Sequence, residues 1–121
     1  MREDVIGPVE AYLNGLGSKD LNAAPFHQDI VFEGPLGPPI HGAAALREFL
    51  TGMFPAINGI QIVRHIVEGE WCATVFDFKT AFGVIPIMDC FRVVEGQIVS
   101  IRPYYDPRPV IEGMARAAKS A

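Results

Sequence analysis

The sequence predicts an α+β fold: a strongly curved antiparallel β-sheet packed on three helices near the N-terminus, with a pocket between the sheet and the helices. Two patterns predict it. Apolar residues recur at helical spacing in residues 4–17 and again after His41-Gly42. Four β-rich runs then occupy most of residues 59–105, separated by the short turns EGE, FG and EG. Helices followed by a strand meander are typical of α+β domains whose helices cover one face of a sheet.

The composition fits one globular domain over residues 1–121. Half of the residues are apolar and a fifth are charged, unlike disordered sequences. The formal net charge is −4 and basic residues are scattered, so we expect no nucleic-acid partner. No apolar run approaches the ~18 residues of a membrane span, and the first residues, MREDVIGPVEAYL, carry acidic groups where a signal peptide carries basic ones. We therefore expect a cytoplasmic protein without a membrane partner.

The cysteines and histidines form no metal-binding pattern. Cys72 and Cys90 have neither the spacing of a zinc site nor that of a disulfide framework. His27, His41 and His65 lie far apart, and we interpret His27 and His65 as ordinary loop and strand residues. We expect reduced cysteines and no metal or other cofactor.

The first predicted helix covers residues 4–17. Asp4 can cap its first turn, and Pro8 lies close enough to the start to be tolerated. Tyr12 belongs to its apolar face, and its hydroxyl needs a partner once it is buried. The apolar residues of this face are Val5, Ile6, Val9, Tyr12, Leu13 and Leu16.

The next segment is predicted to hold a short helix, a strand and a loop. Asp20 can cap a short helix over LNAAPF, which Pro25 disturbs. DIVFE is predicted to be the first strand. GPLGPP must be a loop, because glycine and proline leave no regular alternative.

A second amphipathic helix is predicted after Gly42, ending before Pro55. Its apolar stripe is Leu46, Phe49, Leu50 and Met53. The strands that follow are GIQIVRHIVEG, WCATVFDFKTAF, IPIMDCFRVV and QIVSIRPYY. A final helix is predicted over PVIEGMARAAKSA, with Asp106 and Pro107 as its cap and first residue.

Asp89 is the most informative single residue, because it lies in the middle of an apolar strand. It shares an alternating face with Ile85, Ile87, Phe91 and Val93. Removing an unpaired carboxylate from water is costly, so Asp89 should be hydrogen-bonded, protonated or functional. A core carboxyl and a ligand-facing carboxyl are both open interpretations.

The turn EG fixes the pairing of the last two strands. A three-residue loop with Gly96 in a left-handed conformation sets Val94 opposite Ile98 and Asp89 opposite Pro103. The predicted inward face is Ile87, Asp89, Phe91, Val93, Ile101, Pro103 and Tyr105. The predicted outward residues are Arg92, Arg102 and Tyr104.

The preceding hairpin leaves two registers open. A turn centred on Gly83 sets Asp77 opposite Asp89, where one of the two carboxyls would hold a proton near neutrality. A turn one residue shorter sets Phe76 opposite Asp89 and directs Asp77 away, where it can pair with Lys79.

The order of these segments resembles the nuclear transport factor 2-like superfamily, in its SnoaL-like and ketosteroid isomerase-like branch. The marks are AYLNGLGSKDL, FEGPLGPPIHGAAALREFL, IMDCFRVVEGQIVSIR and YYDP. The resemblance covers nearly the whole chain. It implies a cone formed by a strongly bent antiparallel sheet and three helices, and a homodimer.

The same resemblance implies a catalytic arrangement. Ketosteroid isomerases use a tyrosine of the first helix and a protonated aspartate of the sheet as an oxyanion hole, with a second aspartate as base. Tyr12 and Asp89 match the two donor positions. Gly34 stands at the base position, and its neighbour Glu33 is the nearby carboxylate.

The chain is also similar to limonene epoxide hydrolases across PLGPPIHG, GMF and EGQIVSIRPYYD. Those enzymes use an arginine flanked by two aspartates. Asp77 matches one aspartate, whereas Val75 stands at the arginine position and Pro103 at the second aspartate.

The leading functional hypothesis is an enzyme acting on a small apolar molecule that carries a carbonyl or phenolic oxygen. Protonated Asp89 and Tyr12 would donate to that oxygen, and Asp77 or Glu33 would serve as base in an isomerisation, ring closure or hydration. The alternatives are an epoxide hydrolase-like enzyme and a non-catalytic ligand-binding or dimeric interaction domain. The predicted pocket wall is Phe91, Ile101, Pro103, Tyr105, Phe49 and Met53.

Overall fold

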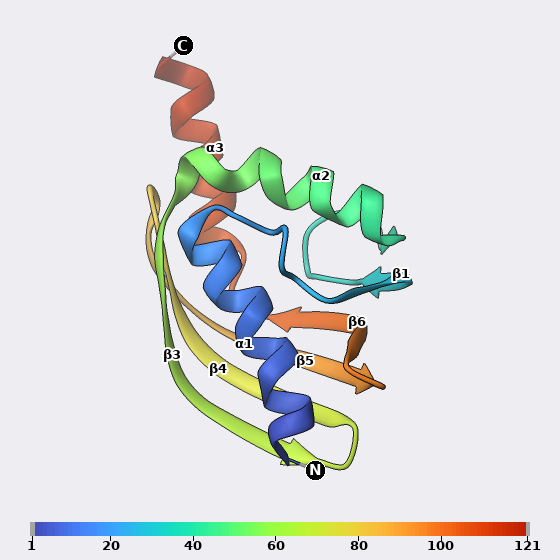
Figure 1. The fold of residues 1–121 in the computed structure, drawn as a ribbon. Helices are drawn as coiled ribbons and strands as arrows, with labels where there is room; N and C mark the ends of the chain where they lie inside the picture. The colour runs from blue at the N-terminus through green and yellow to red at the C-terminus, as the bar shows by residue number, and fades with distance from the viewer. Residues whose placement is uncertain (1, 121) are drawn as a thin grey trace.

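The computed structural model describes residues 2–120, which form a curved six-stranded sheet and three α-helices (Figure 1). The strand order is β2-β1-β6-β5-β4-β3. The elements are α1 (Arg2–Ser18), β1 (Phe26–Phe32), β2 (Ile40–His41), α2 (Ala43–Met53), the 3₁₀ helix η1 (Phe54–Ala56), β3 (Ile57–Glu68), β4 (Trp71–Thr80), β5 (Gly83–Val94), β6 (Gln97–Tyr104) and α3 (Arg108–Ser120). The predicted α+β fold with a strongly curved sheet is confirmed.

The sheet is mixed, so the prediction of a wholly antiparallel sheet is wrong in one place. The β3–β4–β5–β6 meander is antiparallel, but β1 pairs in parallel with β6. Periodicity shows which face of a strand is buried and gives no direction for a pairing between strands that lie far apart in the chain.

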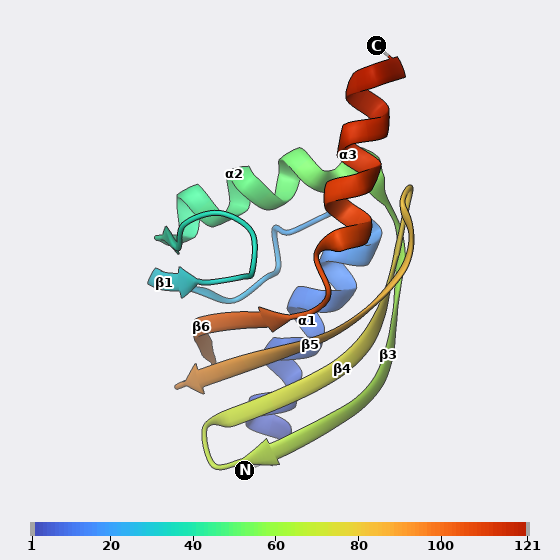
Figure 2. The ribbon, with the colours of Figure 1, turned by 180° about the vertical axis from the view of Figure 1, so that it is seen from behind.

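The first helix, α1, lies across the concave side of the sheet and packs on β3, β4, β5 and β6 (Figures 1 and 2). It continues through Pro8, as predicted. Helix α2 covers the end of the sheet formed by β1 and β2 and packs on both strands. The core therefore lies between α1 and the inner sheet face. The buried residues of α1 are Val5, Val9, Tyr12, Leu13 and Leu16.

The prediction of a short helix over residues 21–26 is wrong, and so is the prediction that all three helices of the fold lie near the N-terminus. Residues 21–25 form no helix: the Asn22 backbone N–H donates to Asp20 Oδ1 over 3.0 Å in a local turn. Such turns compete with helix formation, and Pro25 breaks what remains. The third helix of the fold is consequently α3, at the C-terminal end.

Helix α3 begins where the sequence predicts. The Arg108 backbone N–H donates to Asp106 Oδ1 over 3.0 Å, so Asp106 caps the helix. The helix projects from the body of the molecule (Figure 2). Its contact with the β4–β5 turn is close, because a Cβ atom on Gly113 would lie 2.3 Å from a ring carbon of Phe82. Ala121, the last residue of the predicted helix, lies outside the described residues.

Helix α2 ends at Met53, before Pro55, as predicted. Leu46 and Leu50 are buried, but the predicted stripe is wrong for Phe49, whose side chain is 44% exposed. The Phe49 ring centroid lies 5.8 Å from that of Phe32, so it packs over the edge of the core.

The β5–β6 hairpin reaches the predicted pairing by a different route. Its turn has two residues, Glu95 and Gly96, both with positive φ, so the predicted three-residue loop is wrong. A bulge between Arg92 and Val93 then adds one residue to β6. As a result Asp89 lies opposite Pro103, as predicted.

The β4–β5 hairpin follows neither predicted register. Thr80 pairs with Gly83, Asp77 with Pro86 and Thr74 with Asp89. The Thr80 hydroxyl explains the shift, because it accepts from the Phe82 backbone N–H over 3.0 Å and donates to the Gly83 carbonyl over 2.8 Å. These bonds close the turn before Gly83 rather than around it.

Candidate functional site

Asp89 lies on the inner face of β5 beneath α1, and its side chain is almost fully enclosed. The residue is 2% exposed. Burial raises the pKa of its carboxyl to about 8, and no cation or hydrogen bond within the described residues counters that rise. The carboxyl therefore carries a proton at neutral pH and can donate a hydrogen bond.

Tyr12 reaches the same region from α1. Its ring centroid lies 5.5 Å from that of Phe26 and 5.9 Å from that of Phe91. Burial, and next the nearby Asp89 carboxyl, raise the pKa of Tyr12 well above its usual value. Both groups are therefore protonated near neutrality, and the Asp89 carboxyl lies close enough to Tyr12 to raise the pKa of its hydroxyl.

A third hydroxyl, that of Tyr105, lies at the end of β6 and is half-buried. Burial and then Asp89 raise the pKa of Tyr105. Tyr105 and Pro103 also line a cleft of about 540 Å³, and Pro103 is the cross-strand partner of Asp89. The remaining lining residues are Glu33, Gly34, Pro35, Pro39, Arg102 and Tyr104. Pro103 therefore links this cleft to the strand position of Asp89.

A larger cleft, of about 770 Å³, lies at the start of α1 and contains neither Asp89 nor Tyr12. Its acidic residues, Glu3, Asp4, Glu70 and Glu95, surround apolar Val5 and Val93. Its volume exceeds that of the Pro103 cleft, but it does not adjoin the buried donors.

The other predicted site residues lie on both faces of the sheet and on α2. Phe91, Ile101 and Pro103 are buried on the inner face with Asp89, and Met53 is half-buried against the core. Asp77 lies half-buried on the outer face, between the buried side chains of Phe76 and Phe78 in the chain.

Glu33 and Phe49 lie away from the buried donors. Glu33 lies at the rim of the cleft, where one carboxylate oxygen is 3.1 Å from Arg102 Nη2. Phe49 is largely exposed on α2. The structure thus brings Asp89 together with Tyr12 and Tyr105, and places neither predicted base beside them.

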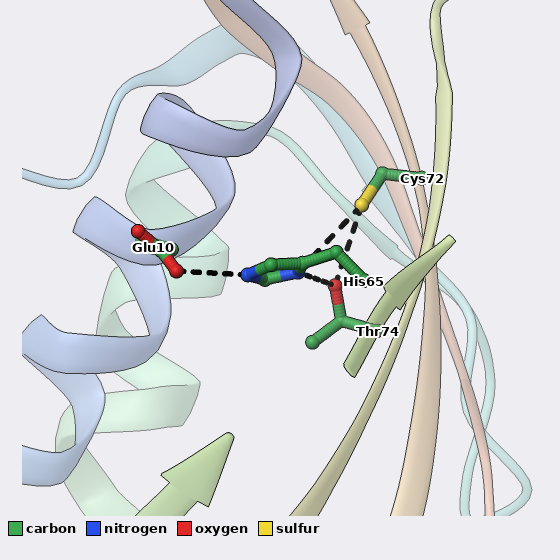
Figure 3. Close-up of polar contacts among 4 residues, drawn as sticks. All are labelled: Glu10, His65, Cys72 and Thr74. Carbon is green, nitrogen blue, oxygen red and sulfur yellow. Dashed lines mark hydrogen bonds and ion pairs between the residues drawn. The ribbon is translucent and has the colours of Figure 1, made fainter. Parts of the chain in front are cut away.

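Sequence reasoning missed a polar chain next to this site (Figure 3). His65 Nε2 lies 2.8 Å from Glu10 Oε2, and His65 Nδ1 lies 2.8 Å from Thr74 Oγ1. The Cys72 sulfur lies 3.4 Å from the same Thr74 oxygen and 3.9 Å from His65 Nδ1. Burial raises the pKa of the Cys72 thiol, which stays neutral. A threonine on the inner face of a strand, on the same face as a histidine of the preceding strand, is the sequence pattern that could have indicated these hydrogen bonds.

Within residues 2–120, no group of three or more potential ligands is arranged to hold a metal ion. No helix in that range is long and apolar enough to cross a membrane.

Comparisons with known proteins agree with the fold. Residues 9–101 match a family described as the SnoaL-like domain. A search of curated proteins found no match.

Several solved structures are similar. A protein from Kribbella flavida DSM 17836 has 22% identity and a TM-score of 0.84 over 98% of both chains. A steroid delta-isomerase from Pseudomonas aeruginosa has 20% identity and a TM-score of 0.74, covering 97% of this chain and 93% of its own. A proposed SnoaL-like polyketide cyclase from Jannaschia sp. CCS1 has 12% identity and a TM-score of 0.76 over 89% of both chains. At these identities the likeness concerns the fold.

Proposed function

The chain belongs to the SnoaL-like domain family and has a nuclear transport factor 2-like fold, and from this premise we propose that it is an enzyme acting on a small, largely apolar molecule with a carbonyl or phenolic oxygen. The observation that carries the proposal is the enclosed, neutral Asp89 carboxyl next to Tyr12.

Both donors suit an oxygen on which negative charge develops. A neutral carboxyl and a neutral phenol each offer one O–H, and burial keeps water from competing with the substrate for them. The aromatic and aliphatic residues around them, including Phe26 and Phe91, favour an apolar substrate. Isomerisation or ring closure through an enol-like intermediate uses such donors directly.

The cleft next to Pro103 and Tyr105 is the proposed entrance. It adjoins the Asp89 strand pair and is lined on one side by the proline-rich loop after β1. The names of the similar steroid delta-isomerase and proposed polyketide cyclase favour the same class of chemistry. We do not extend the proposal to epoxide hydrolysis, because Asp77 pairs with Pro86 on the outer face.

The proposed enzyme is a homodimer that associates through the outer sheet face. Val75, Met88 and Tyr104 form one cross-strand row on that face, and Met88 and Tyr104 are 37% and 50% exposed. A row of this kind offers apolar area to a second copy of the chain.

The test separates turnover from binding. Turnover of a β,γ-unsaturated ketosteroid and binding of 2-naphthol are measured for the native protein and for Asp89→Asn and Asp89→Ala. Asp89→Asn is expected to lower turnover by roughly 100-fold or more while keeping binding, because an amide still donates a hydrogen bond. Asp89→Ala is expected to lose both.

The matched control is Asp29→Asn, which changes an exposed aspartate of β1. It is expected to retain native turnover and binding. Native binding and turnover in all three variants would contradict the proposed function, since Asp89 would then touch no ligand.

A further inference from the structure

The Pro103 cleft, of about 540 Å³, lies where β6 continues past the end of β1 (Figures 1 and 2). The last pair between these strands is Phe32 with Ile101, and β6 runs on to Tyr104. The Glu33 backbone N–H still donates to the Ile101 carbonyl over 3.0 Å, and the chain then turns away in the proline-rich loop. Within residues 2–120, no strand pairs with this last part of β6 on the side of β1. The cleft therefore occupies the place that a longer β1 would fill.

Because β6 has no neighbouring strand there, side chains from both faces of the sheet line the cleft. Pro103 is buried on the inner face as the cross-strand partner of Asp89, and Tyr105 is half-buried against the core. Arg102 and Tyr104 are exposed on the outer face. A molecule in the cleft can therefore point one end toward Asp89 and leave its other end at the outer mouth.

The outer mouth of the cleft carries a guanidinium. Arg102 is the one cationic residue among the described residues that line the cleft. Its Nη2 atom lies 3.1 Å from Glu33 Oε1, and its Cζ atom lies 5.8 Å from the centre of the Tyr104 ring. These two contacts hold the guanidinium in place. The Arg102 side chain is 60% exposed, so a ligand in the cleft can reach it.

The donors of this guanidinium suit a carboxylate. A guanidinium has five N–H groups in a planar fork, and two of them can bind both oxygens of one carboxylate. The contact with Glu33 leaves most of these donors available. An exposed ion pair of this kind contributes little to stability, so a ligand can displace Glu33 at low cost. Because the Tyr104 ring also holds Arg102, Glu33 is the partner that moves aside.

We propose that Arg102 selects substrates that carry a carboxylate at the end opposite the reacting oxygen. The carbonyl or phenolic oxygen would lie beneath α1 with Asp89 and Tyr12, and the carboxylate would replace Glu33 on the guanidinium. This inference rests on the proposed function and narrows its substrate class from apolar molecules to apolar acids. Arg102 touches no reacting atom, so it is a specificity-determining residue.

The sheet order sets the length of such a substrate. β5, β6 and the end of β1 occupy successive places in the sheet. Neighbouring strands lie about 4.7–4.9 Å apart, so roughly 10 Å separates Asp89 from the Glu33–Arg102 pair. A bicyclic aromatic acid with a hydroxyl and a carboxylate at opposite ends fits this separation. The cleft volume of about 540 Å³ is also typical of pockets for small molecules.

A purely structural role for the Glu33–Arg102 pair makes a different prediction. The pair joins the end of β1 to β6. If that were its purpose, its removal would change stability and leave the relative affinities for acidic and neutral ligands unchanged. The experiment therefore measures the ratio of two dissociation constants.

The probes are 6-hydroxy-2-naphthoate and its neutral counterpart 6-hydroxy-2-naphthamide, with binding measured by calorimetry at low ionic strength. The native protein is expected to bind the acid about tenfold more tightly than the amide. Arg102→Gln is expected to reduce this preference to within about twofold and to leave the affinity for the amide unchanged. Glu33→Gln removes the competing anion and is expected to increase the preference for the acid.

The matched control is Arg92→Gln. Arg92 Nη2 lies 2.9 Å from Glu70 Oε1 and its Cζ atom lies 5.8 Å from the Trp71 ring, so both contacts resemble those of Arg102. Arg92 does not line the cleft, and its variant is expected to keep the native preference. Equal affinities of the native protein for the two probes, or a native preference in Arg102→Gln, would overturn the inference. A weaker preference in Glu33→Gln would overturn it too.

Failure of this inference and failure of the proposed function are distinguishable. If Asp89→Ala loses both probes while Arg102→Gln keeps the native preference, the selection by Arg102 is removed and the proposed function stands. If the preference depends on Arg102 but Asp89→Ala binds both probes like the native protein, the carboxylate contact stands and the proposed function is removed. A native protein that binds neither probe contradicts both.

Discussion

Thr74 and Asp89 are direct cross-strand partners on β4 and β5, and both side chains are enclosed by the core. The pairing places a hydroxyl beside a carboxyl that has lost almost all contact with water. Because a buried carboxyl is easier to keep neutral than charged, the burial of Asp89 should make the stability of the protein depend on pH.

The first prediction concerns stability against pH. The folded-state pKa of Asp89 is raised from 3.8 to about 8, so the unfolded chain releases this proton at lower pH than the folded protein. The free energy of unfolding should therefore fall by up to roughly 1.4 kcal/mol per pH unit between those two values and level off above the upper one. Asp89→Asn should lack this slope. Urea unfolding of both proteins from pH 5 to 9 checks it, and parallel curves would contradict the assignment.

The second prediction compares the importance of Asp77 and Asp89 for turnover. Asp77→Asn should reduce turnover far less than Asp89→Asn, because Asp77 is half-buried on the opposite face. Steady-state kinetics of the two variants, measured on the same substrate, provide the comparison. Equal losses would mean that the outer face, and not the region beneath α1, contains the reacting groups.

The third prediction concerns the contact between α3 and the β4–β5 turn. A Cβ atom on Gly113 would lie 2.3 Å from the Phe82 ring, so Gly113→Ala must displace that ring or the helix. The cost should be about 1–3 kcal/mol, as for other overpacked contacts. Amide hydrogen exchange should show faster exchange in α3 and unchanged protection in β5. Phe82→Ala in the same chain should restore the protection of α3; continued fast exchange would show that the ring is not the obstacle.

The fourth prediction tests the dimer. Met88→Lys places a charge in the centre of the row that includes Val75 and Tyr104, and a buried unpaired charge is costly. Light scattering after size-exclusion chromatography should show the native mass halved. Lys79→Met, at an exposed position of β4, is a control that adds apolar area away from this row. A native monomer, or an unaltered Met88→Lys dimer, would rule out this face.

The sequence was sufficient to place Asp89 on the inner face of its strand. The pairing with Pro103 agrees with the prediction only because the shorter turn and the bulge offset each other. Strand alternation decides the face, and the alternation of β5 does not depend on the length of either turn. The sequence was not sufficient to identify Thr74 of β4 as the other cross-strand partner of Asp89. The Thr80 hydroxyl closes the β4–β5 turn through local hydrogen bonds, which the periodicity of the strands does not reveal. The two predicted Asp77 registers failed for that reason.

The Glu10–His65 contact could not be predicted from the sequence, for another reason. The two residues are separated by 55 positions, and the rotation of α1 on the sheet decides whether they meet. An apolar stripe fixes that rotation only to within the width of the stripe. The parallel pairing of β1 with β6 is equally a matter of tertiary arrangement.

The bulge in the β5–β6 hairpin has a consequence for how this chain can change in length over evolution. Val99 is the residue left without a partner between the Arg92–Ser100 and Val93–Ile98 pairs. Its deletion would leave a regular two-residue hairpin in which Asp89 still faces Pro103. A deletion between Ser100 and Pro103 would instead turn the end of β6 over and bring an outward-facing residue against Asp89. Relatives that differ by one residue in this hairpin should therefore differ at the position of Val99.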